Sequence, residues 1–208
     1  MTSLVNWFLG GRCVVCGAAG PSLCPDCRWQ LPAADEVPAP APLADITALV
    51  RYEARGRDLV RALKYHNRRS VVGELGQAMA RAAPGDHDVV TWLPTTGRRR
   101  RQRGFDQARL LAVAVARASG RPGRPLLRRV DAQAQTGRSR RDRLGGPTLH
   151  VAGPAEGVVV LVDDVVTTGA SLRAGARALT EAGAVRVHGL ALAQTPRLVR
   201  SPSEVGRR

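Results

Sequence analysis

An unbroken run of apolar, mostly β-branched residues occupies positions 158–162, and two aspartates follow it directly. A run of this kind suits a strand that is buried on both faces, as in a parallel sheet. After a short polar turn, Leu172, Ala176 and Leu179 recur at helical spacing, and Gly183 is suited to end that helix. The pattern therefore predicts a strand, a tight turn and a helix in direct succession.

Similar patterns extend over most of the chain. Apolar runs predict four further strands, at residues 46–52, 89–93, 125–130 and 185–193. Helical spacing predicts three further helices, one after Gly56, one at about 70–83 and one with Asp106 as its N-cap. Strands that alternate with helices predict an α/β fold with a parallel sheet.

Composition divides the chain into four segments. All four cysteines precede residue 30, and residues 31–44 hold four prolines in fourteen positions, which is typical of an extended, semi-rigid linker. We therefore predict a small N-terminal Cys₄ module (1–30), a Pro/Ala-rich linker (31–44), a main domain (45–195) and a flexible tail (196–208).

The polar residues after the apolar run predict a site for a phosphorylated sugar. In an open α/β sheet, ligands bind at the carboxyl ends of the strands, where Asp163 and Asp164 stand. Carboxylates suit sugar hydroxyls or a Mg²⁺ ion, and the start of a helix after a turn of small residues binds phosphate. The alternative is an ordinary strand–turn–helix with two solvated aspartates. The expected site comprises Asp163, Asp164, Val165, Val166, Thr167, Thr168, Gly169, Ala170 and Ser171.

Two arginine-rich loops are expected at the same edge of the sheet. The first holds five arginines between Gly97 and Gly104, and the second holds four arginines within residues 133–147. Arginine forks match phosphate oxygens, so the first loop suits pyrophosphate, with Arg98 and Arg103 as the candidate contacts. The second loop suits a lid over a phosphorylated ligand. A solvated basic loop is the alternative interpretation of the first.

The four cysteines are spaced as metal ligands. Cys13 and Cys16 form one Cys-x-x-Cys pair, and Cys24 and Cys27 form a second. This spacing lets both thiolates of a pair bind one tetrahedral ion, which predicts a closed, structural Zn²⁺ site. Disulfides and a redox dithiol are the alternatives. A cytosolic compartment keeps thiols reduced and weighs against the first of them.

Composition adds a strong positive charge. The 208 residues include 32 basic and 17 acidic ones, and the net charge of +15 favours anionic partners such as phosphorylated metabolites or nucleic acid. Lys64 is the only lysine, so an arginine-rich codon bias accounts for part of this charge. No apolar run approaches the roughly 20 residues that span a bilayer. We expect a cytoplasmic protein without membrane insertion.

Several motifs together resemble the ComF family, the competence proteins or ComF-like phosphoribosyltransferases. The run from Leu161 to Ser171 resembles the motif with which type I phosphoribosyltransferases bind phosphoribosyl pyrophosphate (PRPP). The other matching features are the Cys₄ module, Leu63-Lys64-Tyr65, Arg103-Gly104-Phe105-Asp106-Gln107, and Gln135 with Arg143. Two positions depart from the family pattern, because Asp106 and Gly145 stand where asparagine is usual.

The resemblance implies a type I phosphoribosyltransferase fold, PRPP with Mg²⁺ as the ligand, and a role in DNA uptake during natural transformation on the cytoplasmic side. An enzyme of this kind displaces pyrophosphate from C1 of PRPP, with Asp163 and Asp164 as the catalytic residues that hold the ribose hydroxyls. The alternative is a catalytically silent PRPP sensor that binds single-stranded DNA or a DNA-uptake helicase. The sequence identifies neither an acceptor site nor an oligomeric state.

Overall fold

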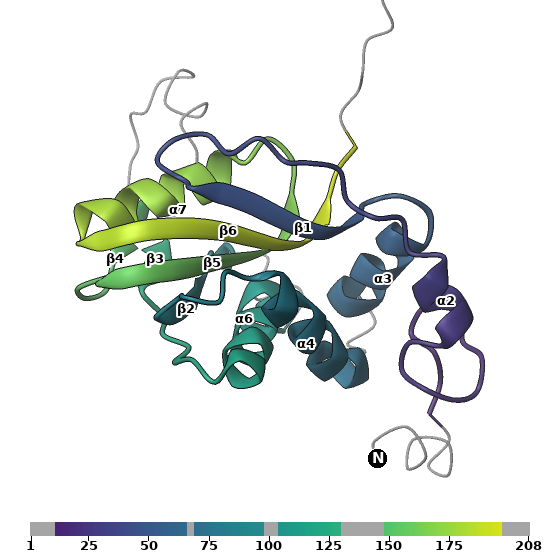
Figure 1. The fold of residues 1–208 in the computed structure, drawn as a ribbon. Helices are drawn as coiled ribbons and strands as arrows, with labels where there is room; N and C mark the ends of the chain where they lie inside the picture. The colour runs from purple at the N-terminus through teal and green to yellow at the C-terminus, as the bar shows by residue number, and fades with distance from the viewer. Residues whose placement is uncertain (1–10, 66–68, 98–103, 130–147, 197–208) are drawn as a thin grey trace, which may run out of the picture.

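The computed structural model describes residues 11–65, 69–97, 104–129 and 148–196, and Figure 1 shows their arrangement. Four parallel strands form the main sheet in the order β1-β6-β5-β2. They are β1 (Asp45–Arg51), β6 (Ala184–Gln194), β5 (Gly157–Val166) and β2 (Val89–Trp92). The apolar run therefore lies in β5, inside the sheet, and the predicted α/β fold with a parallel sheet is confirmed.

Helices cover both faces of the sheet, as Figure 1 shows. One face carries α3 (Ala54–Tyr65), α4 (Val72–Ala82) after the short 3-10 helix η1 (Arg69–Val71), and α6 (Gln107–Ser119), and the other carries α7 (Ala170–Glu181). Val160 and Val162 of β5 pack with the first layer, whereas Val159 and Leu161 pack with α7. This period of two buries the strand on both faces. No described helix is long and apolar enough to cross a membrane.

A separate antiparallel ribbon lies beside the main sheet. It consists of β3 (Leu127–Arg129) and β4 (Leu149–Val151). The strand predicted at 125–130 is β3, but β4 was not predicted, because three residues are too few to show a periodic pattern. Leu127 packs in the same cluster as α7. The second arginine-rich loop, between the two strands, lies outside the described residues.

The cysteine-containing segment packs against the helices of the first layer. Its short helix α2 (Pro25–Trp29) follows the second cysteine pair, and Cys13, Leu23 and Cys27 share one hydrophobic cluster with Leu59 of α3. Arg28 also forms an ion pair with Glu74 of α4, and Arg55 Nε donates to Gln30 Oε1 at 3.3 Å. Apolar and polar contacts thus attach this segment to α3 and α4.

The proline-rich segment 31–44 runs antiparallel along β1. It forms isolated bridges between Ala33 and Val50 and between Val37 and Ile46. The N–H of Arg51 also donates to the carbonyl of Pro32 at 2.9 Å. The segment therefore covers the outer edge of β1, which a sheet must otherwise protect from pairing with other chains. The domain boundaries themselves stay a prediction.

Candidate functional site

Asp163 and Asp164, the acid pair, lie in the carboxyl-terminal part of β5. The strand continues through them to Val166, so it is longer than the apolar run that predicted it. Both side chains are half-buried, and the N–H of Asp164 donates to Oδ1 of Asp163 at 2.8 Å. Because the acid pair lies near the end of β5, it stands toward the carboxyl edge of the parallel sheet, where open α/β sheets bind ligands.

The acid pair is electrostatically strained, and Lys64 compensates part of its charge. Burial raises the pKa of Asp163 well above its ordinary value, and the charge of Asp164 raises it further. Lys64 of α3 acts against this shift, because its positive charge lowers the pKa of Asp163. Lys64 Nζ lies 2.9 Å from Asp164 Oδ2, and the two side chains are only 15% and 21% exposed. Two carboxylates and one ammonium group therefore form a partly buried cluster.

Sequence reasoning missed the role of Lys64 at this site. It singled out Lys64 only as part of a family motif and as the one lysine in the chain. The partner, Asp164, follows much later in the sequence, and only the packing of α3 on the sheet brings the two side chains together. The Tyr52 ring lies beside the same ammonium group, with its centroid 6.0 Å from Nζ. The presence of a single lysine among many arginines was the feature of the sequence that could have drawn attention to this position.

Replacing Lys64 with methionine is expected to lower stability at pH 7 by about 1–3 kcal/mol. The change leaves Asp164 without its ammonium partner and raises the pKa of Asp163 further. A carboxyl whose pKa is raised in the folded state destabilises the protein only above its unfolded-state pKa. The loss of stability in the variant therefore shrinks as the pH falls toward about 4. Chemical unfolding at both pH values measures this, with Lys64→Arg as the charge-retaining control. An equal deficit at both pH values would show that packing, not charge, is at work.

A tight turn follows the acid pair. β5 ends at Val166, and Thr167 and Thr168 are exposed. Gly169 has a φ of 74°, in the left-handed region that favours glycine. A Cβ atom at this position would also lie 3.2 Å from Cδ1 of Ile46, which is a crowded contact. Backbone conformation and space both therefore call for glycine at this turn.

Helix α7 begins directly after the turn with Ala170 and Ser171. Its N-cap residue, Gly169, has no side chain that could accept a hydrogen bond from the first turn. The N–H of Ala170 lies 3.4 Å from Thr168 Oγ1, which is a weak contact. The first N–H groups and the positive end of the helix dipole therefore stand beside exposed threonine hydroxyls. The structure thus brings the residues predicted at 163–171 together as strand end, turn and helix start.

The first arginine-rich loop begins after β2. The predicted contacts Arg98 and Arg103 lie outside the described residues, but both ends of the loop are described. Asp106 holds these ends together, because Oδ2 accepts from the N–H of Thr95 at 3.0 Å and Oδ1 accepts from the N–H of Arg109 at 3.3 Å. The predicted N-cap of α6 is confirmed. Asparagine has one acceptor oxygen, so the aspartate at this position makes a bond that asparagine cannot make.

Replacing Asp106 with alanine is expected to destabilise the protein by about 1–2 kcal/mol, because α6 loses its cap and Thr95 loses its acceptor. Asp106→Asn keeps one of the two bonds and is expected to lose about half as much. Equilibrium unfolding of the two variants beside the unchanged protein gives both values. If Asp106→Asn is as stable as the unchanged protein, the bond to Thr95 contributes nothing.

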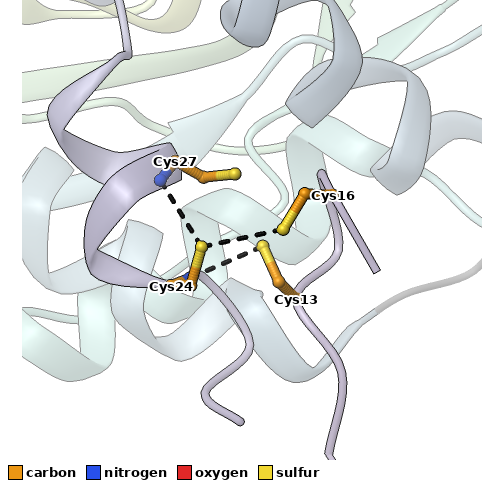
Figure 2. A group of neighbouring side chains, drawn as sticks. All are labelled: Cys13, Cys16, Cys24 and Cys27. Carbon is orange, nitrogen blue, oxygen red and sulfur yellow. Dashed lines mark hydrogen bonds between the residues drawn. The ribbon is translucent and has the colours of Figure 1, made fainter. Parts of the chain in front are cut away.

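The four cysteine sulfurs face one another, as Figure 2 shows, and all four Sγ atoms lie within 4.8 Å of one another. Cys16 and Cys24 Sγ are 3.7 Å apart, near the roughly 3.8 Å expected for two thiolates on a tetrahedral Zn²⁺ ion. The thiols are free, which disagrees with the disulfide alternative. Backbone N–H groups also point at sulfur, from Cys24 to Cys13 and from Cys27 to Cys24. The donor set and spacing fit a metal such as zinc.

The ionisation of one thiol, that of Cys13, also suits metal binding. Burial raises the pKa of Cys13, but hydrogen bonds from the backbone of Cys16, Cys24 and Val15 outweigh it and lower the pKa to about 6. Burial raises the pKa of Cys27 above its ordinary value, and hydrogen bonds with the neighbouring cysteine side chains raise it further. A thiolate is the form that binds metal, so Cys13 is a ligand prepared at neutral pH.

The parallel sheet, with an acid pair, a glycine turn and a helix start at the end of β5, defines an α/β protein with helices on both faces of the sheet. No family model matches the chain. The DNA utilization protein YhgH of Salmonella typhimurium is 30% identical over 215 aligned positions, and the match covers 93% of each chain. Competence protein ComFC of Bacillus subtilis is 27% identical over 191 residues, covering 87% of this chain and 76% of that protein. The chain belongs to the ComF family.

Two solved structures are similar in part. Glutamine PRPP amidotransferase from Bacillus subtilis is 28% identical with a TM-score of 0.45, over 59% of this chain and 26% of that chain. The purine phosphoribosyltransferase from Pyrococcus horikoshii is 17% identical with a TM-score of 0.37, over 64% of this chain and 76% of that chain.

Proposed function

We propose that this protein binds PRPP with Mg²⁺ at the carboxyl edge of the sheet and transfers or senses its phosphoribosyl group. One observation carries the proposal: β5 leads from the acid pair through the Gly169 turn directly into the start of α7. Carboxylates and a helix start in this order offer acceptors to sugar hydroxyls and donors to a phosphate. The ordinary alternative, two solvated aspartates, does not account for the burial and charge strain at Asp163.

Each part of the segment has a place in this proposal. Asp163 and Asp164 accept hydrogen bonds from the two ribose hydroxyls, and Lys64 limits the repulsion between the carboxylates. The N–H groups at the start of α7, with Thr167, Thr168 and Ser171, donate to the 5′-phosphate. Mg²⁺, when bound with PRPP, neutralises pyrophosphate charge, and the carboxylates are the residues that would hold it directly or through water. Arg98 and Arg103 are the proposed pyrophosphate contacts.

The proposed biological role is DNA uptake in natural transformation, on the cytoplasmic side. The names of two relatives support it, since one is a competence protein and the other a DNA utilization protein. The net charge of +15 suits a phosphate backbone, and the proposed macromolecular partners are single-stranded DNA and a DNA-uptake helicase. The cysteine site is proposed to hold one structural Zn²⁺, because four thiols close the coordination sphere and leave no open position.

Pyrophosphate release separates transfer from sensing. The full chain is incubated with Mg²⁺-PRPP and a panel of nucleobases, beside Asp163→Asn/Asp164→Asn and the matched control Asp86→Asn/Glu181→Gln, whose parent side chains are exposed. Base-dependent release that the first variant loses and the control keeps is the result expected of a transferase. PRPP binding without release would favour the silent sensor. The absence of both PRPP binding and pyrophosphate release would overturn the assignment of the site.

A further inference from the structure

A cavity of about 1280 Å³ lies beside the outer edge of β2, apart from the acid pair and the Gly169 turn. Its walls come from α6, from the two described ends of the first arginine-rich loop, and from the segment that leads into β3. No residue between 163 and 171 lines it. Small-molecule sites typically enclose about 300–1,000 Å³, so this space admits a ligand of nucleotide size.

One part of the cavity is apolar and aromatic. Trp92 closes the end of β2 and is only 8% exposed, while Phe105 is half-buried. Leu110 and Val113 follow Asp106 at i+4 and i+7 on one face of α6, and Val113 is 47% exposed although it is apolar. Aromatic side chains beside exposed aliphatic ones offer a surface on which a planar ring can stack.

The other part of the cavity is cationic. Arg109 of α6 and Arg128 of β3 are exposed, and Arg129 follows Arg128 directly in β3. Asp106 is the only carboxylate among the described lining residues, and both of its oxygens already accept backbone N–H groups. Three arginines from two elements therefore line the cavity together with one carboxylate that is already engaged. Guanidinium forks of this kind match phosphate oxygens.

Backbone groups supply a third type of contact. Among the described residues, the outer edge of β2 is paired only at Val90, whose N–H donates to Pro122 and whose carbonyl accepts from Arg124, each at 2.9 Å. Leu93 instead donates to Val162 on the β5 side at 3.0 Å. Because successive residues of a parallel strand face alternate neighbours, the N–H and carbonyl of Trp92 face the outer edge, as those of Val90 do. A donor and an acceptor thus lie on the side of the aromatic wall, suited to the edge of a ring.

We propose that this cavity is a binding site for a nucleoside monophosphate, with its base against Trp92 and Phe105 and its phosphate at Arg109 and Arg128. The site is separate from the PRPP site, but Thr95 and Asp106 line it and also form the base of the loop proposed to contact pyrophosphate. A nucleotide in the cavity therefore rests against the described ends of that loop. The proposal stands on the cavity alone and does not require that PRPP is bound or turned over.

The test is calorimetric titration of the full chain with AMP, GMP, CMP and UMP, and with adenosine and ribose 5-phosphate to separate ring from phosphate. At least one nucleotide is expected to bind tenfold more tightly than either fragment. Arg109→Ala/Arg128→Ala is expected to weaken that binding at least tenfold. The matched control Arg117→Ala/Arg124→Ala removes the same charge from exposed positions of α6 and the following segment, outside the cavity, and is expected to change it less than twofold.

The acid-pair variant tells the two sites apart. Asp163→Asn/Asp164→Asn is expected to keep nucleotide binding within twofold of the unchanged protein. Nucleotide binding that this variant loses and the double arginine variant keeps would place the nucleotide at the acid pair and overturn the inference. No nucleotide binding at millimolar concentration would also overturn it. A chain that binds nucleotide as expected but not PRPP would leave this inference standing and refute the proposed function.

Discussion

Replacing Cys24 with serine is expected to remove one Zn²⁺ per chain and to lower the thermal midpoint by more than about 10 °C. Metal binding contributes folding free energy directly, because the four thiolates come together only in the folded chain. The effect extends beyond the cysteines, since Cys13, Leu23 and Cys27 share a hydrophobic cluster with α3. Elemental analysis and thermal unfolding of the same preparations measure both results.

Ser22→Ala is the matched control for this variant. Ser22 is buried between the two cysteine pairs, and its loss leaves all four sulfur ligands in place. The control is expected to keep one metal ion per chain, with a small change in the thermal midpoint. Metal-free wild-type protein, or a Cys24→Ser variant with its full metal content, would refute the zinc site.

Replacing Asp163 with asparagine is expected to raise stability at pH 7 while it weakens PRPP binding at least tenfold. In the folded protein, burial and then the charge of Asp164 raise the pKa of Asp163, so its ionisation opposes folding. This destabilisation grows as the pH rises from the unfolded-state pKa, about 3.9, through the raised folded-state pKa. Asparagine does not ionise, so the gain is present at pH 7 and absent at about pH 4. Each kcal/mol raises the thermal midpoint by about 2–4 °C.

Asp164→Asn is the matched comparison, since it makes the same chemical change one residue away. It removes the partner of Lys64 and leaves a partly buried ammonium group without it, so stability at pH 7 is expected to fall. Opposite signs for the two neighbours would identify Asp163 as the residue whose charge is held at a cost for ligand binding. Loss of stability in both variants would contradict the raised pKa of Asp163.

Local patterns were sufficient to predict the core of this fold. The apolar run in β5 and the helical spacing of α7 depend on neighbouring residues alone, so strand, turn and helix follow from the sequence. The cap at Asp106 is equally local, because its acceptor serves the N–H of Arg109 three residues later. The cysteine cluster follows from the spacing of two short pairs.

Contacts between distant segments could not be predicted in this way. The ion pair between Lys64 and Asp164 depends on how α3 packs on the sheet, and no local pattern encodes that packing. β4 is too short to have a period, and its partner β3 precedes it across a long loop. The cavity beside Trp92 needs three elements to enclose it. The strand that carries the acid pair was predicted, but its compensating cation was not.

Calorimetric titration of the full chain with PRPP in the presence of Mg²⁺ tests the proposed PRPP site most directly. We expect saturable binding of one PRPP per chain, weakened at least tenfold by Asp163→Asn/Asp164→Asn, which is about 1.4 kcal/mol or more. The exposed control Asp86→Asn/Glu181→Gln is predicted to bind as tightly as the unchanged protein. Absence of binding by the unchanged protein, or equal affinity in the acid-pair variant, would contradict the assignment of the 163–171 segment as the PRPP site.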